Sequence, residues 1–92
     1  MEQKRKFHHN LHDKTIISKD MGPRITKIRT AVNMSVEDLA IELEMSPQQL
    51  EAIENGTELP SLQEMIIIGY IYDVTLEFLV FGREKNNLVT ML

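Results

Sequence analysis

The histidines at positions 8, 9 and 12 are the residues whose type and spacing come closest to a chemical site. His8 and His12 would share one face if this segment were helical, and histidines at that spacing can bind a metal ion. Nothing else in the sequence completes such a site. We therefore interpret His8, His9 and His12 as incidental residues and expect neither a bound metal nor a cofactor.

Catalytic chemistry has little support in the remaining residues. The chain has no cysteine and no glycine-rich phosphate loop, and its carboxylates are scattered over predicted helical surfaces. We predict a non-catalytic protein with no small-molecule substrate. The lack of cysteine excludes a disulfide framework and favours the cytoplasm. The longest apolar run, from Met65 to Tyr72, is too short to span a bilayer, and we expect neither a targeting segment nor membrane association.

Charge is distributed very unevenly along the chain. Residues 1–29 contain eight Lys and Arg and three Asp and Glu, a net charge of +5, whereas residues 30–92 carry −9. The first three bases, Lys4, Arg5 and Lys6, follow one another directly. This asymmetry indicates a basic arm with its own electrostatic task, attached to an acidic body.

Five helices are predicted to position these residues. The first starts near Asp20, with Pro23 in its first turn, where a missing N–H does no harm. The second follows the cap Ser35 and runs to about Leu43, and the third covers about 46–55 and stops at Asn55-Gly56. A fourth helix of about eleven residues follows Pro60-Ser61 and ends near Tyr72, and a short fifth helix is capped by Thr75 and ended by Gly82. We therefore divide the chain into a flexible basic arm (1–18), a helical domain (19–82) and a tail (83–92).

The second and third helices are separated only by Glu44, Met45 and the cap Ser46, a connection typical of a helix-turn-helix. The chain from Pro23 to Gly82 resembles the lambda-repressor-like, or Xre-type, helix-turn-helix family. The resemblance rests on Arg24-Ile25 and Arg29, on Ser35 to Ala40, on the run from Met45 to Gly56, on Pro60-Ser61-Leu62 and on Leu76 to Leu79. It implies an all-α, five-helix bundle that binds double-stranded DNA as a transcriptional regulator.

The resemblance also implies that the third helix enters the major groove. If Leu50 and Ile53 are buried, helical periodicity places Gln48, Ala52 and Asn55 on the outer face, flanked by Gln49 and Glu51. A glutamine amide offers the paired donor and acceptor that the adenine edge requires. Alternatively, Gln48 and Gln49 are ordinary solvated residues. The predicted DNA-binding residues are Ser46, Pro47, Gln48, Gln49, Glu51, Ala52 and Asn55 of this helix, with Lys4, Arg5 and Lys6 of the arm.

In similar proteins, the positions of Arg29 and Glu54 often form a structural ion pair between the first and third helices. The alternative is that Arg29 contacts a DNA phosphate. Asn55, just before Gly56, is a candidate phosphate contact or simply the last polar residue of its helix.

Three departures from the family pattern weaken phosphate binding. Val36 replaces the usual Gln that opens the second helix, Glu44 replaces a common turn Gly, and Thr57 and Glu58 stand where Lys or Arg is frequent. Since phosphate contacts supply most sequence-independent affinity, the basic arm is a possible compensation, and a solvated leader is the alternative.

Two predictions concern partners. We predict a symmetric homodimer formed by the fourth and fifth helices with help from the tail, because the pair is very rich in apolar residues: Ile67, Tyr70, Ile71, Phe78 and Phe81. The rival function is a protein-interaction module, a helix-turn-helix fold that pairs with another regulator and binds DNA weakly or not at all.

Overall fold

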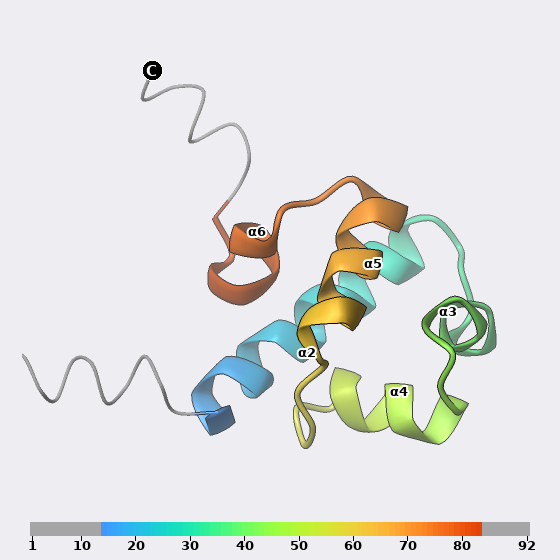
Figure 1. The fold of residues 1–92 in the computed structure, drawn as a ribbon, viewed down its shortest axis with the longest axis horizontal. Coiled ribbons are helices and arrows are strands. Elements are labelled where there is room, and N and C mark those ends of the chain that lie inside the picture. The colour runs from blue at the N-terminus through green and yellow to red at the C-terminus, as the bar shows by residue number, and fades with distance from the viewer. Residues whose placement is uncertain (1–13, 84–92) are drawn as a thin grey trace, which may run out of the picture.

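The computed structural model describes residues 14–83, with side chains from Lys19 onward, and this part of the chain is helical without strands (Figure 1). The helices are α2 (Lys14–Ala31), α3 (Val36–Leu43), α4 (Pro47–Glu54), α5 (Leu62–Tyr72) and α6 (Leu76–Phe81). The predicted five-helix bundle is confirmed. None of the helices in this described part is both long and apolar enough to cross a membrane.

Hydroxyl side chains start four of the helices. Ser35, Ser46, Ser61 and Thr75 are extended N-cap residues, and each hydroxyl accepts a hydrogen bond from the backbone N–H three positions later. In α3 and α5 a carboxylate, from Asp38 and Glu64 respectively, accepts from the N-cap backbone in return, which completes a capping box. These local bonds satisfy N–H groups that a helix start leaves free, so they fix where each helix begins.

The predicted start of the first helix near Asp20 is wrong. α2 begins at Lys14, so Pro23 lies inside the helix and residues 14–18, which we assigned to the arm, are helical. Proline removes one intrahelical hydrogen bond, but Met21, on the turn before it, is only 1% exposed. Met21 packs against the core, and this contact keeps the residues before Pro23 in the helix. Residues 1–13 lie outside the described part.

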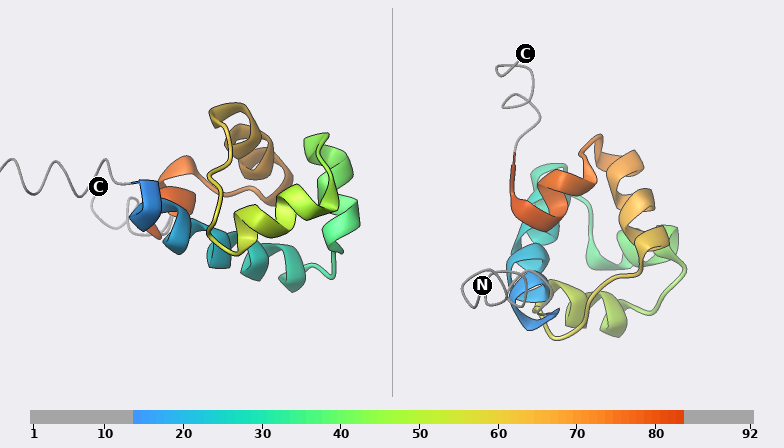
Figure 2. Two further views of the ribbon diagram at one scale, coloured as in Figure 1. Left: turned by 90° about the horizontal axis from the view of Figure 1, so that it is seen from below. Right: turned by 60° about the vertical axis from the view of Figure 1, so that its left-hand side comes forward.

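Every helix contributes to one apolar core. Its buried members are Met21, Ile25, Leu39, Ala40, Leu43, Leu50, Ile53, Ile68 and Leu79. α2 packs against α4 and α6, and α5 packs against α3 and α6. The views in Figure 2 show α2 and α5 on opposite sides of the bundle, and the right-hand view shows α4 along its lower edge. α4 is thus held by the core along its inner side.

Gly22 allows α2 to pass directly against the C-terminal end of α4. A Cβ atom at this position would lie 2.4 Å from the Glu54 carbonyl oxygen and 2.6 Å from that of Ile53. Any larger residue would push the two helices apart. The backbone of α2 therefore sets the position of the last turn of α4.

The apolar residues predicted to face a second subunit have two different fates. Ile67, Ile71 and Phe78 are half-buried and pack against the core of their own chain. Tyr70 and Phe81 are exposed, by 89% and 52%. An all-apolar helix gives no periodic signal for its inner side, which is why the sequence did not separate the two groups.

Ile53 is expected to be essential for stability, because it is 2% exposed where α4 meets the core. Ile53→Ala should lower the free energy of unfolding by about 2–5 kcal/mol through reduced burial and a residual cavity. The control is Ile41→Ala, since Ile41 is 72% exposed, and it should change stability by no more than about 0.5 kcal/mol. Urea denaturation measures the stability of both variants. Equal unfolding midpoints for Ile53→Ala and Ile41→Ala would show that the inner side of α4 is misassigned.

Candidate nucleic-acid interface

The connection between α3 and α4 is a tight turn built around Glu44. This residue has φ 56 and ψ 46, and its N–H bonds to the carbonyls of Ala40 and Ile41. The Met45 N–H then bonds to the Ala40 carbonyl at 3.0 Å, and Ser46 starts α4. Figure 1 shows α3 along its axis while α4 lies across the view, so the turn sends the second helix in a new direction. Because a left-handed conformation suits glycine better, Glu44 holds this turn at some cost in stability.

The outer side of α4 is polar and open to solvent. Gln48, Gln49, Glu51 and Asn55 are exposed, Ala52 is half-buried, and Leu50 and Ile53 are buried. At the helix start Ser46 is exposed and Pro47 half-buried. Neither glutamine side chain has a hydrogen-bond partner among the described residues, since the bond at Gln49 is made by its backbone N–H to Ser46 Oγ. Two amide groups are therefore available on the first turn of α4.

The last turn of α4 is fixed by Arg29 of α2. Its guanidinium donates from Nε to Glu54 Oε2 at 2.8 Å and from Nη2 to Glu54 Oε1 at 3.0 Å. A third bond runs from Nη1 to the Met34 carbonyl at 2.7 Å, in the loop between α2 and α3. Both partners of the ion pair are almost buried, with side chains 10% and 8% exposed. Arg29 thus makes the interhelical contact implied by the resemblance, rather than facing a phosphate.

The protonation of this junction is well defined. The hydrogen bond to Glu54 raises the pKa of the Arg29 guanidinium above its ordinary value, so it stays charged. Tyr72 of α5 donates its hydroxyl to Met34 Sδ at 3.0 Å, and burial raises the pKa of this phenol. The Arg29 guanidinium therefore stays charged and the Tyr72 hydroxyl keeps its proton at neutral pH, so both continue to donate their hydrogen bonds.

A known protein family matches the sequence of this part of the chain. A family described as helix-turn-helix matches residues 25–79, more than half of the chain. The chain belongs to the helix-turn-helix family. The match covers α3, the turn and α4, and it confirms the resemblance to lambda-repressor-like, Xre-type regulators. Among curated proteins, no significant match is found.

In this helix-turn-helix protein, all three arginines of the described residues have partners within the protein. Arg24 Nη1 donates to the carbonyls of Leu79 and Val80, at 2.9 and 3.1 Å, and so caps the end of α6. Arg83 pairs with Glu77 at 2.8 Å and lies over the Phe81 ring. Together with Arg29, three of the five bases between residues 19 and 83 are occupied. Lys19 and Lys27 of α2 are the bases in that range for which the structure gives no partner.

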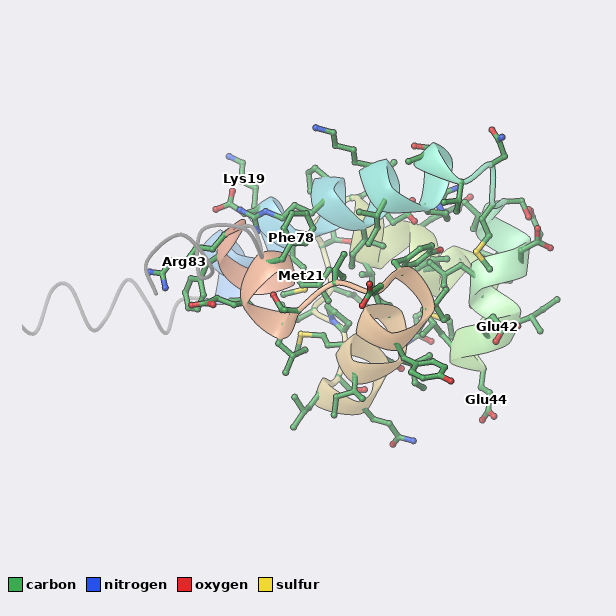
Figure 3. All side chains as sticks on the ribbon, turned by 90° about the horizontal axis from the view of Figure 1, so that it is seen from above. Lys19, Met21, Glu42, Glu44, Phe78 and Arg83 are labelled. Carbon is green, nitrogen blue, oxygen red and sulfur yellow. The ribbon has the colours of Figure 1, made fainter. Side chains whose placement is uncertain are left out.

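The helix-turn-helix region itself is acidic. Residues 19–83 hold five Lys and Arg against eleven Asp and Glu, a net charge of −6. Glu42 and Glu44 project from one end of the molecule, whereas Lys19 and Arg83 lie near the other (Figure 3). Two carboxylates of the α3 end thus lie far from Lys19 and Arg83.

Two of the departures from the family pattern, Val36 and Thr57, have local explanations. Val36 is half-buried and packs against the core, so a structural contact takes the place of a phosphate contact. Thr57 donates its hydroxyl to the Ala52 carbonyl at 2.9 Å and so closes the end of α4. Asn55 is the C-cap, and Gly56 follows with φ 84, a left-handed conformation that ends the helix where the sequence predicted. Val36 and Thr57 each replace a possible DNA contact with a bond or contact inside the protein.

The remaining predicted residues lie outside this description. Lys4, Arg5, Lys6 and the three histidines precede residue 14. Within the described residues, no group of three or more His, Cys, Asp or Glu is placed to hold a metal ion. Sequence reasoning missed Arg24, because its carbonyl partners are 55 and 56 positions away.

Removing the carboxylate of the buried Arg29–Glu54 pair should lower the free energy of unfolding far more than removing that of the more exposed Arg83–Glu77 pair. Glu54→Ala leaves Arg29 buried with an unpaired charge, and we expect the free energy of unfolding to fall by about 3–5 kcal/mol. Glu77→Ala is the control: its partner Arg83 has a side chain 62% exposed, so the decrease should be no more than about 1 kcal/mol. Equal decreases in urea denaturation would contradict the structural role of the Arg29–Glu54 pair.

Proposed function

We propose that this helix-turn-helix protein is a non-catalytic transcriptional regulator of the cytoplasm that reads the major groove of double-stranded DNA with α4. The observation that carries the proposal is the outer side of α4, where two glutamine amides stand exposed without protein partners among the described residues. An α-helix fits the major groove, and sequence is read there by side-chain donors and acceptors. Gln48 supplies both, in the geometry of an adenine edge.

The rigidity of α4 supports this role. Its first turn is capped by Ser46, its inner side is anchored by Leu50 and Ile53, and its last turn is held by Glu54. A reading helix must keep its side chains in register with the base pairs, and these contacts prevent α4 from rotating. We propose that Gln48 contacts a base directly, that Ser46, Pro47, Gln49, Glu51 and Ala52 line the groove, and that Asn55 faces the backbone.

Affinity for the phosphate backbone must come from elsewhere in the chain. Residues 19–83 carry a net charge of −6, and Glu44 and Glu51 are exposed beside the proposed reading surface. We propose that Lys4, Arg5 and Lys6 supply the missing phosphate contacts, assisted by Lys19 and Lys27 of α2. An arm of this kind can follow the backbone or enter the minor groove.

We further propose that the protein acts as a homodimer. A two-fold symmetric pair would place two α4 helices in successive major grooves, about 34 Å apart on one face of the duplex. Each half-site would then be read by one Gln48. Two contact sets also raise affinity, which an acidic body needs.

The acidic surface also favours a second candidate function, a module that pairs with another regulator. With Arg24, Arg29 and Arg83 engaged inside the protein, the described body offers few contacts to phosphate. A gel shift at two salt concentrations separates the two functions, because phosphate-driven binding weakens steeply as salt rises. Absence of any shift at low salt would favour the protein-interaction function.

Gln48→Ala is expected to reduce discrimination at one base pair of each half-site, by about 1–3 kcal/mol, while affinity for random duplex stays nearly unchanged. The matched control is Gln63→Ala, which removes an exposed amide from α5. Competition binding with specific and random duplexes measures the ratio of the two affinities. If both variants keep the parental ratio, Gln48 is a solvated residue and does not read a base.

Replacing Lys4, Arg5 and Lys6 by Gln should weaken binding to all sequences alike. The slope of log affinity against log salt should fall by about one unit for each phosphate that the variant no longer binds. Lys85→Gln, a single charge removed from the tail, serves as the control and should keep the parental slope. A triple variant with an unchanged slope would show that the arm takes no part in binding.

A further inference from the structure

Asn55 and Gly56, which end α4, form the one Asn-Gly pair of the sequence. The other asparagines, at positions 10, 33, 86 and 87, precede Leu, Met, Asn and Leu. In an Asn-Gly pair the backbone nitrogen of glycine can attack the side-chain amide carbon of asparagine, because glycine has no side chain to block the approach. Asn55 is therefore the asparagine whose neighbour best permits such a reaction within the chain.

The reaction needs only these two residues and water. The Gly56 nitrogen forms a bond to Asn55 Cγ and loses its proton, while the Cγ–Nδ2 bond breaks and ammonia leaves. Water then hydrolyses one of the two C–N bonds of the resulting five-membered imide. Cleavage at Cγ gives aspartate, whereas cleavage at the main-chain carbonyl gives isoaspartate, in which the chain runs through the side-chain carbon. Either product is negatively charged at neutral pH, which asparagine is not.

The Asn55 side chain is accessible to this reaction. It is exposed, and its amide has no hydrogen-bond partner among the described residues. Water therefore reaches the amide, and no side-chain hydrogen bond has to break before the side chain turns toward Gly56. Asn33, the other asparagine of the described residues, is also exposed, but it precedes Met34, whose side chain packs against the core. Asn33 is therefore a natural internal control.

The backbone, by contrast, holds the pair in a conformation that cannot react. Asn55 has ψ −8, which places the Gly56 nitrogen in line with the backbone nitrogen of Asn55 rather than beside its Cβ, where ring closure requires it. The Gly56 N–H also donates to the Ile53 carbonyl at 3.1 Å. Just beyond, Thr57 donates both its N–H and its hydroxyl to the Ala52 carbonyl, each at 2.9 Å. Ring closure therefore requires this last turn of α4 to open first.

The Arg29–Glu54 pair limits how often this turn opens. Glu54 directly precedes Asn55, and its two carboxylate oxygens accept hydrogen bonds from Arg29 at 2.8 and 3.0 Å. The backbone of Gly22 lies against the Glu54 carbonyl and so packs the same turn against α2. A reaction that needs a segment to open proceeds in proportion to the population of the open form. The contacts that position α4 thus also slow the reaction at its end.

We propose that Asn55-Gly56 is a site of spontaneous deamidation, controlled by opening of the last turn of α4, that adds negative charge to the DNA-facing helix. The consequence for DNA rests on the function proposed above, in which Asn55 faces the backbone of the duplex. A carboxylate there repels phosphate, and negative charge is unfavourable at the C-terminal end of a helix. Glu51 and Glu58, both exposed, already make this end of α4 acidic. Isoaspartate also lengthens the main chain where the turn closes, so it removes the geometry that ends α4.

The test is incubation of the full chain at neutral pH without DNA. Peptide mass mapping detects the exchange of the amide NH₂ for a hydroxyl group, and labelling by an isoaspartyl methyltransferase detects isoaspartate. In the folded chain we expect Asn55 to react and Asn33 to stay intact. In guanidinium chloride, which opens the turn, Asn55 should react at least about tenfold faster, equivalent to an opening free energy of at least about 1.4 kcal/mol in the folded chain.

Gly56→Ala identifies the attacking nitrogen. A Cβ atom beside that nitrogen hinders ring closure, so the variant should react several-fold more slowly than the parent when both are unfolded in guanidinium chloride. Comparison of the unfolded chains removes any effect of the substitution on the fold. A Gly56→Ala variant that reacts as fast as the parent would overturn the proposal. So would a folded parent in which Asn55 reacts no faster than Asn33.

Control by the last turn is tested with the buried ion pair. Glu54→Ala should raise the rate at Asn55 in the folded chain at least about tenfold, since a loss of about 1.4 kcal/mol in the stability of the turn suffices for this. Glu77→Ala, which breaks the exposed pair on α6, is the matched control and should keep the parental rate. Circular dichroism checks that each variant is folded, and Glu54→Gln replaces Glu54→Ala if that variant is not. Equal rates in the Glu54 variant and the parent, or in the folded and unfolded parent, would overturn the proposed control.

DNA binding is scored separately, with Asn55→Asp as a stable copy of the aspartate product. Its affinity for specific and random duplexes should fall by about 2–5-fold, the effect of one surface charge. Gln63→Glu, which adds the same charge at an exposed position of α5, is the control and should keep nearly the parental affinity. Reaction at Asn55 with unchanged affinity of Asn55→Asp would leave the modification site standing and contradict the proposed contact of Asn55 with DNA. Reduced affinity without any reaction at Asn55 would overturn the modification site and leave that contact standing.

Discussion

The guanidinium of Arg29 lies where α2, the loop after it and α4 meet, and its three hydrogen bonds join these segments into one unit. A buried charge is tolerated only when its donors are satisfied, so the position of Glu54 is restricted to the few placements that satisfy both oxygens. Glu54 belongs to the last turn of α4, so this turn is fixed as well. Gly22 of α2 has no side chain and lets the turn pack directly against α2. The direction in which Gln48 points therefore depends on an interaction at the far end of its own helix.

Other arginines also form contacts inside the protein, which explains why the described residues include few Lys or Arg side chains without a protein partner. Arg24, Arg29 and Arg83 each contribute to the fold, by capping α6, by holding α4 and by pairing on α6. A small domain has little apolar surface to bury, so it depends more on specific contacts, of which the buried Arg29–Glu54 pair is the most costly to break. The cost is a surface with few phosphate ligands, which in the proposed function moves the task of holding DNA to the basic run of Lys4, Arg5 and Lys6.

Much of the fold was predictable from the sequence because its signals are local. Ser35, Ser46 and Ser61 cap helices within three residues of themselves, and Gly56 and Gly82 end helices in the left-handed conformation. Contacts between distant residues were not predictable in this way. Proline suggested a helix start at the wrong place because the burial of Met21 cannot be read from its neighbours. In α5 apolar residues occur on all sides, so the sequence could not show that Ile66 and Tyr70 face outward while Ile67 and Ile71 face the core. The outer face of α4 followed from periodicity, and the partner of Arg29 from family resemblance alone.

In the proposed function, α4 is held by Arg29 and the core and reads DNA sequence. The most direct measurement is selection by the full chain from a pool of random duplexes at low salt, followed by sequencing of the retained DNA. We predict an enriched palindrome whose half-sites contain an adenine and lie about one helical turn apart, with retention that falls as salt rises. Retention of no duplex at low salt, or retention without any enriched sequence, would contradict it.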